Sequence, residues 1–298
     1  MGAIVAELER LAVRKTYKLY IGGKFPRTES GRSYLVSDSR GRPLANACRG
    51  SRKDVRDAVR AARGAFAGWS GLTAYNRGQI LYRVAEMLEG RRKQFVDEVA
   101  AAEGSSRRGA GDAVDKAIDR WVWYAGWSDK IAQVLGSANP VAGPYFNFSV
   151  PEPTGVVGLV APADSSLLGL VSRLAPAIVS GNTTVVLASQ DRPLPAVTLA
   201  EVLATSDLPG GVVNLLTGFT AELVKPLAAH MDVDALDLAG LDLAMLRDAE
   251  LAAADSVKRV AAPLKLAPKD WLDDAKGQDP YWMAQFLEIK TVWHPAGV

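Results

Sequence analysis

Short apolar runs alternate with longer segments throughout residues 150–218, which read VPEPTGVVGLVAPADSSLLGLVSRLAPAIVSGNTTVVLASQDRPLPAVTLAEVLATSDLPGGVVNLLTG. Three of these runs, 155–161, 183–187 and 212–215, are rich in valine, leucine and threonine. Each intervening segment is long enough for a helix, which is the pattern of βαβ units. Strands as uniformly apolar as these are expected to be buried on both faces. We therefore predict an α/β fold with a Rossmann-like parallel sheet and helices on both faces.

The region before this core predicts a helical layer. Ser51 is followed three residues later by Asp54, a variant of the capping box that starts helices. Apolar residues then recur at helical spacing after Asp54, again over 80–88, and again from residue 112. Two short strands are predicted ahead of these helices, at 17–21 and 34–36, and they are expected to pair.

The pattern loosens after Gly218. Residues 233–238 (VDALDL) suggest a fourth strand, although its two aspartates make a central position in the sheet unfavourable. Pro263, Pro268 and the charged run 269–276 predict a linker.

Composition excludes several classes of function. The 298 residues are 48% hydrophobic and 23% charged, with a net charge of only +2, so neither nucleic acid nor an anionic membrane is an expected partner. No apolar run approaches the roughly 20 residues that span a bilayer. The first residues lack the apolar centre of a signal peptide, and the single cysteine, Cys48, excludes a disulfide framework and a cysteine-built zinc site. A cytoplasmic protein is the simplest interpretation.

Several segments occur in the order and at the spacing of a known family. These are 153–158 (PTGVVG), 174–177 (LAPA), 181–183 (GNT), 199–201 (LAE), 208–214 (LPGGVVN) and 290–293 (KTVW). The chain resembles the NAD(P)-dependent aldehyde dehydrogenase superfamily, as a shortened member that lacks the catalytic cysteine domain. The resemblance implies five parts: an N-terminal helical part of the cofactor-type domain (1–136), an oligomerisation arm (137–150), a Rossmann-like core (151–262), a linker that replaces the catalytic domain (263–285) and a C-terminal oligomerisation strand (286–298).

The residues that carry out catalysis in that family have no counterparts at the matching positions of this sequence. Its thiolate nucleophile would have to be Cys48, which lies in a strand-like run outside every catalytic segment and is interpreted as a small buried residue. The asparagine that stabilises the oxyanion is replaced by Asp164, whose carboxylate would repel the developing charge. The position of the general base falls near Pro263. We therefore expect no catalytic residue and no metal site on this chain.

The cofactor site is expected to survive only as a degenerate remnant at Asp164, Ala188, Asp191, Gly240 and Leu241. Ala188 stands where the family has a lysine for the adenosine ribose, and Leu241 stands where a serine begins the pyrophosphate-binding helix. Asp242 follows, either as a charge that repels phosphate or as an ordinary N-cap, and both interpretations exclude phosphate. No cofactor is expected on this chain, with NAD bound instead by a partner subunit.

The partner is predicted from the arm and the last strand, which in the family join subunits. The expected oligomerisation residues are Tyr145, Phe146, Phe148, Leu287, Ile289, Thr291 and Trp293. Both segments are expected to have lost the sheet that they would extend within a subunit, and exposed strand edges invite pairing. We predict a non-catalytic subunit that assembles with a full-length aldehyde dehydrogenase in a hetero-oligomer and supports or regulates it.

Three alternatives stay open at this stage. The chain can be an NAD(P)-dependent aldehyde dehydrogenase that works through atypical residues. It can be a stand-alone binding module, in which the acidic remnant near Asp164, Asp191 and Gly240 favours a cation or a polyol. It can also be a truncated product without function, although both flanks of the missing domain are kept.

Overall fold

A five-stranded parallel sheet forms the centre of the computed structural model, which describes residues 13–261 and 266–296. The strand order is β10-β9-β6-β7-β8, and every neighbouring pair is parallel. The strands are β6 (Val156–Val160), β7 (Thr183–Leu187), β8 (Val213–Leu216), β9 (Ala235–Asp237) and β10 (Arg259–Val260). All residues of β6, β7 and β8 are buried. The predicted parallel sheet in an α/β fold is confirmed.

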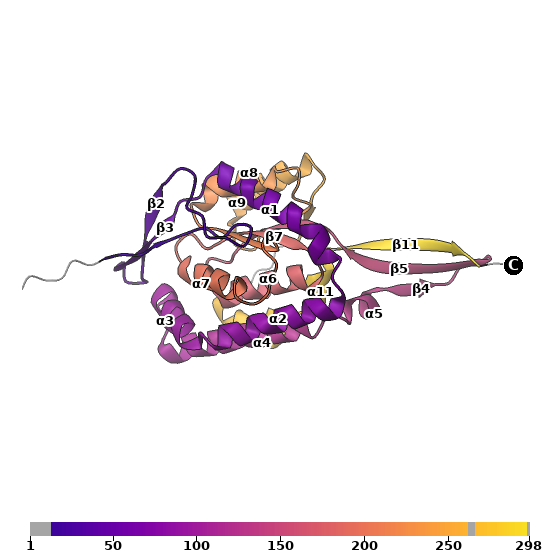
Figure 1. Cartoon of the computed structure of the whole chain (residues 1–298), viewed down its shortest axis with the longest axis horizontal. Coiled ribbons are helices and arrows are strands. Elements are labelled where there is room, and N and C mark those ends of the chain that lie inside the picture. The colour runs from indigo at the N-terminus through magenta and orange to yellow at the C-terminus, as the bar shows by residue number, and fades with distance from the viewer. Residues whose placement is uncertain (1–12, 262–265, 297–298) are drawn as a thin grey trace, which may run out of the picture.

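Helices cover both faces of the sheet (Figure 1). One face carries α1 (Arg52–Ser70), α8 (Thr220–Ala228) and α9 (Leu243–Ala254), and the other carries α6 (Leu168–Val179) and α7 (Leu194–Leu203). An outer layer over α6 and α7 consists of α2 (Ala74–Glu89), α3 (Arg92–Glu103) and α4 (Arg107–Ala125). Because α6 lies between the sheet and this outer layer, all of its residues are buried.

The start of α1 has the predicted capping box. The Ser51 hydroxyl accepts hydrogen bonds from the backbone N–H groups of Lys53 and Asp54, and the Asp54 carboxylate accepts one from the Ser51 N–H at 2.8 Å. This reciprocal arrangement satisfies helix N–H groups that otherwise have no partner.

The two strands predicted near the N-terminus do not pair with each other. They form β1 (Thr16–Tyr17) and β2 (Ser33–Ser37), and β3 (Pro43–Cys48) lies between them in the order β1-β3-β2. The turn at Gly22 and Gly23 joins only Ile21 to Lys24, while the Tyr20 backbone pairs with Leu215 at the edge of the central sheet. The predicted pairing is wrong because a later strand provides a better mate for both segments.

The fourth predicted strand is real but lies inside the sheet. β9 is flanked by β6 and β10, and all three of its residues are buried. Its Asp237 carboxylate is compensated by the buried Arg173 guanidinium of α6, whose Nε lies 2.6 Å away. The expectation that the aspartates disfavour a central position is therefore wrong, since a buried charge is tolerated when it is paired and hydrogen-bonded.

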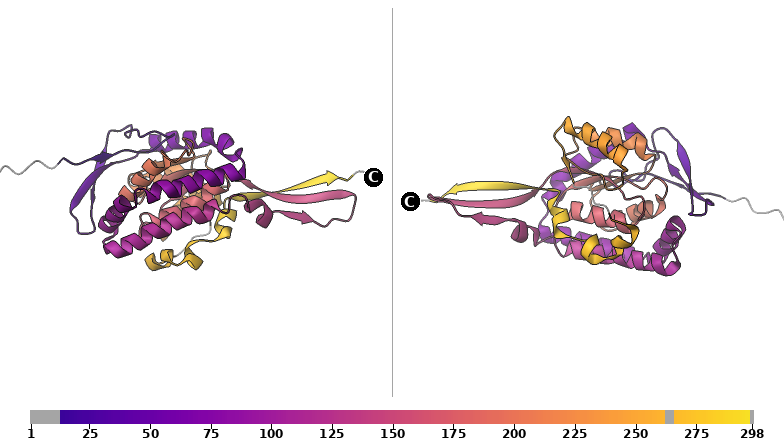
Figure 2. Two further views of the ribbon diagram at one scale, coloured as in Figure 1. Left: turned by 60° about the horizontal axis from the view of Figure 1, so that its bottom comes forward. Right: turned by 180° about the vertical axis from the view of Figure 1, so that it is seen from behind.

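The segment expected to be a linker is packed against the domain in its described part. It contains the 3-10 turn η1 (Pro268–Leu272) and the short helices α10 (Asp274–Gly277) and α11 (Pro280–Ala284). These elements contact α4 and α6, as the left-hand view of Figure 2 shows beneath the outer helices. Trp271, Trp282 and Met283 are buried in the main core. Their burial gives the segment a fixed position.

A three-stranded arm projects from the body (Figure 1), beginning after the short helix α5 (Ile131–Leu135). It consists of β4 (Ser137–Asn139), β5 (Tyr145–Pro153) and β11 (Leu287–Pro295), in the order β11-β5-β4. β11 pairs antiparallel with β5 over its full length, from Leu287 opposite Pro153 to Pro295 opposite Tyr145. The expectation that both strands lack a sheet is wrong for their facing edges, because each is the other's mate.

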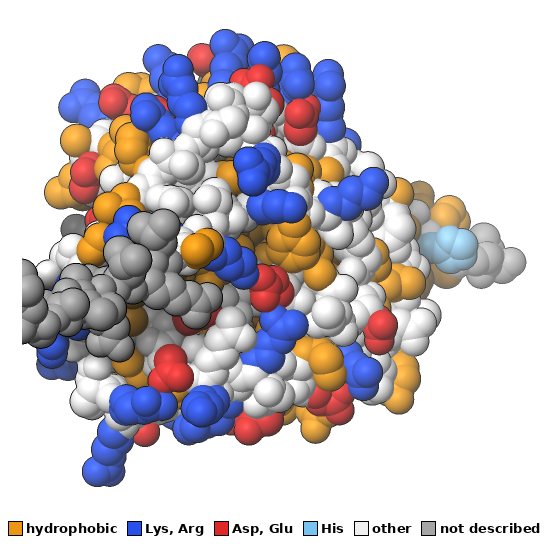
Figure 3. Space-filling model, turned by 60° about the vertical axis from the view of Figure 1, so that its left-hand side comes forward, with side chains coloured by type: hydrophobic (Ala, Val, Ile, Leu, Met, Phe, Trp, Pro, Cys, Tyr) orange, Lys and Arg blue, Asp and Glu red, His pale blue; other side chains and the backbone are white. Residues whose placement is uncertain are grey.

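Charged side chains of both signs are spread over the surface. Lys and Arg are frequent along the top of Figure 3, the side of the molecule formed by α1, α8 and α9. Among the residues that the structure describes, no helix is both long enough and apolar enough to cross a membrane.

Candidate functional site

The candidate site is a crevice of about 570 Å³ at the carboxyl ends of β6 and β9. The loops after these neighbouring strands diverge there, because the chain runs from β6 toward β7 on one side and reaches β9 only later. In open α/β sheets such a switch point is where ligands bind. We call it the switch-point crevice. Its lining residues are Ala161, Pro162, Ala163, Asp164, Ser189, Gln190, Asp191, Thr220, Ala221, Ala239, Gly240, Leu241, Asp242, Met245, Leu266 and Trp271.

The structure brings together four of the five remnant residues predicted from sequence. Asp164, Asp191, Gly240 and Leu241 all line the crevice. Ala188 does not, since it is buried at the end of β7 with its N–H bonded to the Leu216 carbonyl at 2.9 Å. Ala188 therefore offers no side chain to the crevice, where the family resemblance implies a lysine.

Gly240 holds the backbone close to the end of β6. A Cβ at this position would overlap the carbonyl oxygen of Ala161, and the Gly240 N–H donates to the Val160 carbonyl at 3.1 Å. The close approach of two backbones is a recurrent reason for glycine. It fixes the direction in which α9 begins, immediately beside the crevice.

The first turn of α9 has an internal N-cap. Asp242 is the N-cap, and its carboxylate accepts a hydrogen bond from the Met245 N–H at 2.8 Å. An N-terminus that is free attracts phosphate, but one capped by a carboxylate presents negative charge instead. Of the two interpretations of Asp242 from sequence, the geometry matches the N-cap.

The charge on the crevice wall is negative. Asp164, Asp191 and Asp242 line it, and none of the described lining residues is a lysine or an arginine. Arg192 lies nearby but donates to the backbone carbonyl of Asp164 at 3.1 Å. The lining therefore suits a ligand with positive charge or hydroxyl groups better than one with phosphates.

A tyrosine supports the rim from behind. The Tyr34 hydroxyl in β2 donates to the Gln190 carbonyl at 3.1 Å. Burial raises the pKa of this phenol well above its ordinary value, and the nearby Asp191 adds to the shift. Tyr34 therefore stays a neutral donor that fixes the loop after β7.

Two residues of the crevice come from the segment expected to be a linker, and sequence reasoning did not identify them. Leu266 and Trp271 close one side, and the Trp271 carbonyl accepts a hydrogen bond from the buried Arg120 of α4 at 2.6 Å. The signal in the sequence was a tryptophan isolated within a charged run. The Ser189 hydroxyl and the Trp271 indole N–H are buried at this site without a hydrogen-bond partner among the described residues.

The only thiol lies elsewhere. Cys48 is the last residue of β3, is buried, and its carbonyl accepts a hydrogen bond from the Thr217 hydroxyl at 2.6 Å. It is not among the lining residues of the crevice. The general-base position near Pro263 lies outside the described residues. Within the described ranges, no cluster of three or more His, Cys, Asp or Glu side chains could hold a metal ion.

The arm presents most of the predicted oligomerisation residues to solvent. Phe146, Ile289 and Trp293 are exposed by 55%, 56% and 60%, and Tyr145 packs edge-on against Trp293. The Thr291 hydroxyl is hydrogen-bonded to Ser149 across the strands, and Phe148 stacks beside Phe146. Leu287 differs, since it is buried in the core of its own domain.

Comparison with known proteins gives one consistent result. A profile described as "Aldehyde dehydrogenase family" matches residues 26–265. Benzaldehyde dehydrogenase of Antirrhinum majus is 33% identical over 255 residues, covering 83% of this chain and 46% of that protein. The chain spans about half the length of the curated relatives that it matches.

Solved structures with the same fold lead to the same family. The crystal structure of HpcC from Thermus thermophilus superposes with a TM-score of 0.80 at 31% identity, covering 84% of this chain and 48% of the other. An NAD+ complex of aldehyde dehydrogenase from Bacillus cereus gives a TM-score of 0.77 at 26% identity, covering 83% and 50%.

Proposed function

The chain belongs to the aldehyde dehydrogenase family, and we propose that it is a non-catalytic subunit that assembles with a full-length aldehyde dehydrogenase and supports or regulates it. The observation that carries the proposal is the lining of the switch-point crevice, which has three carboxylates and no thiol among its described residues. Chemistry by a thiolate nucleophile needs that group beside the reacting carbon.

The same lining does not fit a dinucleotide. The helix that would face the pyrophosphate begins at the Asp242 carboxylate, and Leu241 offers no hydroxyl donor. Each charge-assisted hydrogen bond that is missing costs about 1.5–3 kcal/mol, so two of them weaken binding by roughly 100- to 10,000-fold. An affinity in the micromolar range would fall to the millimolar range or weaker. We therefore propose that NAD is bound by the partner subunit.

The arm supports the proposed partner. β11 is an edge strand, and no other strand within the described residues covers its outer side. Unpaired N–H and C=O groups on such an edge recruit a strand of another chain. Ile289 and Trp293 stand exposed on the same strand and supply apolar contact area. A second aldehyde dehydrogenase chain, which the family resemblance implies has an arm of its own, is the partner proposed for this edge.

The test is the mass of the intact complex. A tagged form of the chain is purified from its native cells under mild conditions and weighed by native mass spectrometry. We expect a full-length aldehyde dehydrogenase at a fixed stoichiometry, with aldehyde-dependent NADH formation that depends on the partner's cysteine. Recovery of the chain alone, as a monodisperse species, would overturn the partner role.

One observation favours a second function. The fold superposes on half of an aldehyde dehydrogenase chain solved with NAD+, so an enzyme with atypical residues is the competing proposal. The purified chain would then form NADH from NAD+ and an aldehyde without any partner. Activity that survives Cys48→Ser, in a preparation free of other dehydrogenases by mass spectrometry, would replace the non-catalytic role with this one.

A further inference from the structure

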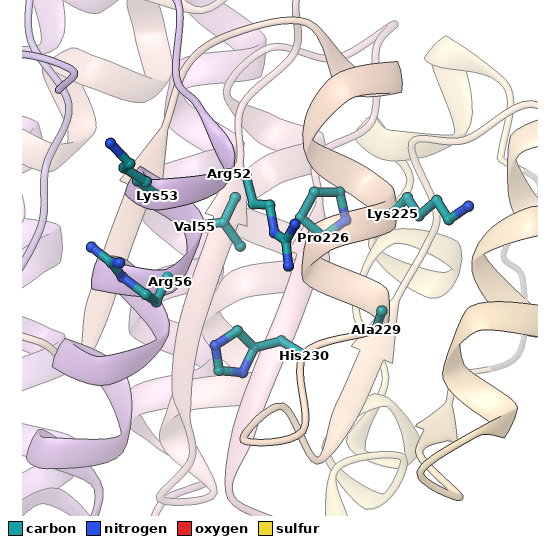
Figure 4. A pocket seen from close by; sticks show the side chains of 8 residues that line it. All are labelled: Arg52, Lys53, Val55, Arg56, Lys225, Pro226, Ala229 and His230. Carbon is teal, nitrogen blue, oxygen red and sulfur yellow. The ribbon is translucent and has the colours of Figure 1, made fainter. Parts of the chain in front are cut away.

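A second concave surface lies between α1 and α8, apart from the switch-point crevice (Figure 4). Its volume is about 790 Å³, within the size range of small-molecule sites. We call it the α1–α8 groove, and its lining residues are Arg52, Lys53, Val55, Arg56, Lys225, Pro226, Ala229 and His230. None of these residues lines the crevice, so the two sites are separate.

The floor of the groove is apolar. Val55 of α1 is buried beneath it, and Pro226 of α8 and its C-cap residue Ala229 form the opposite side. An apolar floor with a few convergent polar groups is the usual composition of a small-molecule site. The floor therefore suits the apolar body of a ligand.

Two polar side chains turn toward this floor. In Figure 4 the Arg52 side chain extends toward α8, where Pro226 lies, and the His230 ring extends toward α1. Lys53, Arg56 and Lys225 line the periphery and direct their charged ends away from the centre. Arg52 and His230 are thus the two groups placed to contact a ligand directly.

Arg52 is left without a counter-ion. Lys53 pairs with Glu29 at 3.0 Å and Arg56 with Asp57 at 2.9 Å, but no described carboxylate lies within ion-pair distance of Arg52. The lining itself contains no acidic residue. An unpaired guanidinium can donate two parallel hydrogen bonds to two oxygens of a phosphate or carboxylate.

The position of Arg52 also contradicts local helix chemistry. It is the first residue of α1, where the helix dipole disfavours a cation and favours an anion. Lys225 and His230, in contrast, lie at the carboxyl end of α8, where cations are favoured. A residue that breaks a local rule without compensation is expected at a functional site.

His230 has one ring nitrogen left to donate. Its Nδ1 accepts a hydrogen bond from the Asp232 N–H at 3.2 Å, which leaves the proton of the neutral ring on Nε2. Burial lowers the pKa of His230 below its ordinary value, against the opposing effect of Asp232. The ring is therefore a neutral N–H donor near pH 7.

We propose that the α1–α8 groove binds a small organic phosphate. The phosphoryl oxygens accept hydrogen bonds from the Arg52 guanidinium and the His230 Nε2–H. The apolar body of the ligand rests on Val55 and Pro226. Lys225 at the periphery adds a positive charge that favours a dianion over a monoanion.

The test is calorimetric titration of the full chain, in its native complex where one forms, with phenyl phosphate at pH 7.5 and low ionic strength. We expect phenyl phosphate to bind more tightly than inorganic phosphate, which lacks the apolar body. We also expect it to bind more tightly than benzoate, which lacks the second charge, and benzyl alcohol to give no heat of binding. Equal binding of phenyl phosphate and inorganic phosphate, or no binding of either, would overturn the proposal.

Variants assign the contacts. Arg52→Gln should weaken the binding of phenyl phosphate by about tenfold or more, and His230→Leu should weaken it while His230→Gln, which keeps an N–H donor, retains most of it. Arg83→Gln is the matched control, because it removes the same charge from an exposed arginine on α2. Arg52 is exposed, so the variant is expected to keep the wild-type melting temperature. Wild-type affinity in Arg52→Gln, or an equal loss in Arg83→Gln, counts against the site.

Discussion

The Arg173 guanidinium of α6 donates through Nε to the Asp237 carboxylate of β9 at 2.6 Å, and both side chains are almost fully buried. Arg173 also lies over the Trp282 ring, 4.6 Å from its centroid. One ion pair thus connects the central sheet, the helix beneath it and the segment after residue 265. Replacing either residue would leave the charge of the other buried in the core without a partner.

We expect Asp237→Ala to lower the free energy of unfolding by about 3–5 kcal/mol, because Arg173 then stays buried without a carboxylate. The double variant Arg173→Met with Asp237→Leu should recover much of that loss, since apolar replacements leave no unpaired charge. Urea unfolding followed by circular dichroism measures both. Glu152→Ala breaks the exposed pair with Lys290 and should cost no more than about 1 kcal/mol. A cost for Asp237→Ala as small as this control would contradict the prediction.

The burial of Trp271 makes the segment 266–286 a structural element. We expect Trp271→Ala to cost about 3–5 kcal/mol, the usual range for a buried aromatic residue. Trypsin should then cut at Lys269 and Lys276 much faster than in the wild-type chain. Leu272→Ala, at the more exposed neighbour, serves as the control and should change little. Rapid cleavage of the wild-type chain at these lysines would mean that the segment is not packed.

Gly240 determines the backbone of the crevice. Because a Cβ there would overlap the Ala161 carbonyl, Gly240→Ala should destabilise the chain by about 1–3 kcal/mol. Gly64→Ala is the matched comparison, since Gly64 lies within α1 with nothing near its Cβ position. It should stabilise the chain by roughly 0.5–1 kcal/mol. Thermal melts of the two variants are expected to shift in opposite directions, and shifts of the same sign would refute the argument.

The buried carboxyl of Glu98 should make the stability of the folded chain depend on pH. Burial raises the pKa of its carboxyl above the ordinary value of 4.5, although Gln94 donates a hydrogen bond that lowers it. A raised folded-state pKa contributes stability that is fully present below about pH 4.5 and is lost as the pH rises through the folded value. The charged form is therefore a net cost at pH 7.

Replacing this carboxyl by its neutral amide should remove that cost. We expect Glu98→Gln to raise the urea midpoint at pH 7, and to raise it less at pH 4.5, because the raised pKa leaves less of the folded carboxyl charged there. Glu89→Gln, at an exposed position on α2, is the control, and its urea midpoint should stay close to that of the wild-type chain. Equal effects of Glu98→Gln at both pH values would contradict the linkage.

The outer edge of the arm is predicted to hold the partner. Ile289→Lys places a charge on the exposed face of β11, where it disfavours the packing of another strand. We expect the native complex to dissociate while the melting temperature of the isolated chain stays unchanged. Leu35→Lys has a similarly exposed apolar side chain in β2, on the opposite side of the molecule from the arm (Figure 1). Its complex should stay intact, and equal behaviour of the two variants would exclude the arm as the contact.

The sequence alone was sufficient for those features of the fold that depend on residues close together in the chain. The alternation over 150–218 was sufficient to predict the buried parallel strands, because period and β-branching act within each element. The capping box at Ser51 involves residues three positions apart. The resemblance to the family implied that Gly240, Leu241 and Asp164 belong to one site, and all three line the crevice.

Tertiary structure alone decided the features that join distant residues. β5 and β11 pair although they lie far apart in the sequence. The residues within an edge strand do not indicate which strand it pairs with. The Asp237 carboxylate is compatible with a central strand only because Arg173 reaches it from α6. Trp271 became part of the crevice because the Arg120 guanidinium holds its carbonyl from α4. Burial of a charge or a ring depends on which elements meet, and that is set by the packing of the whole domain.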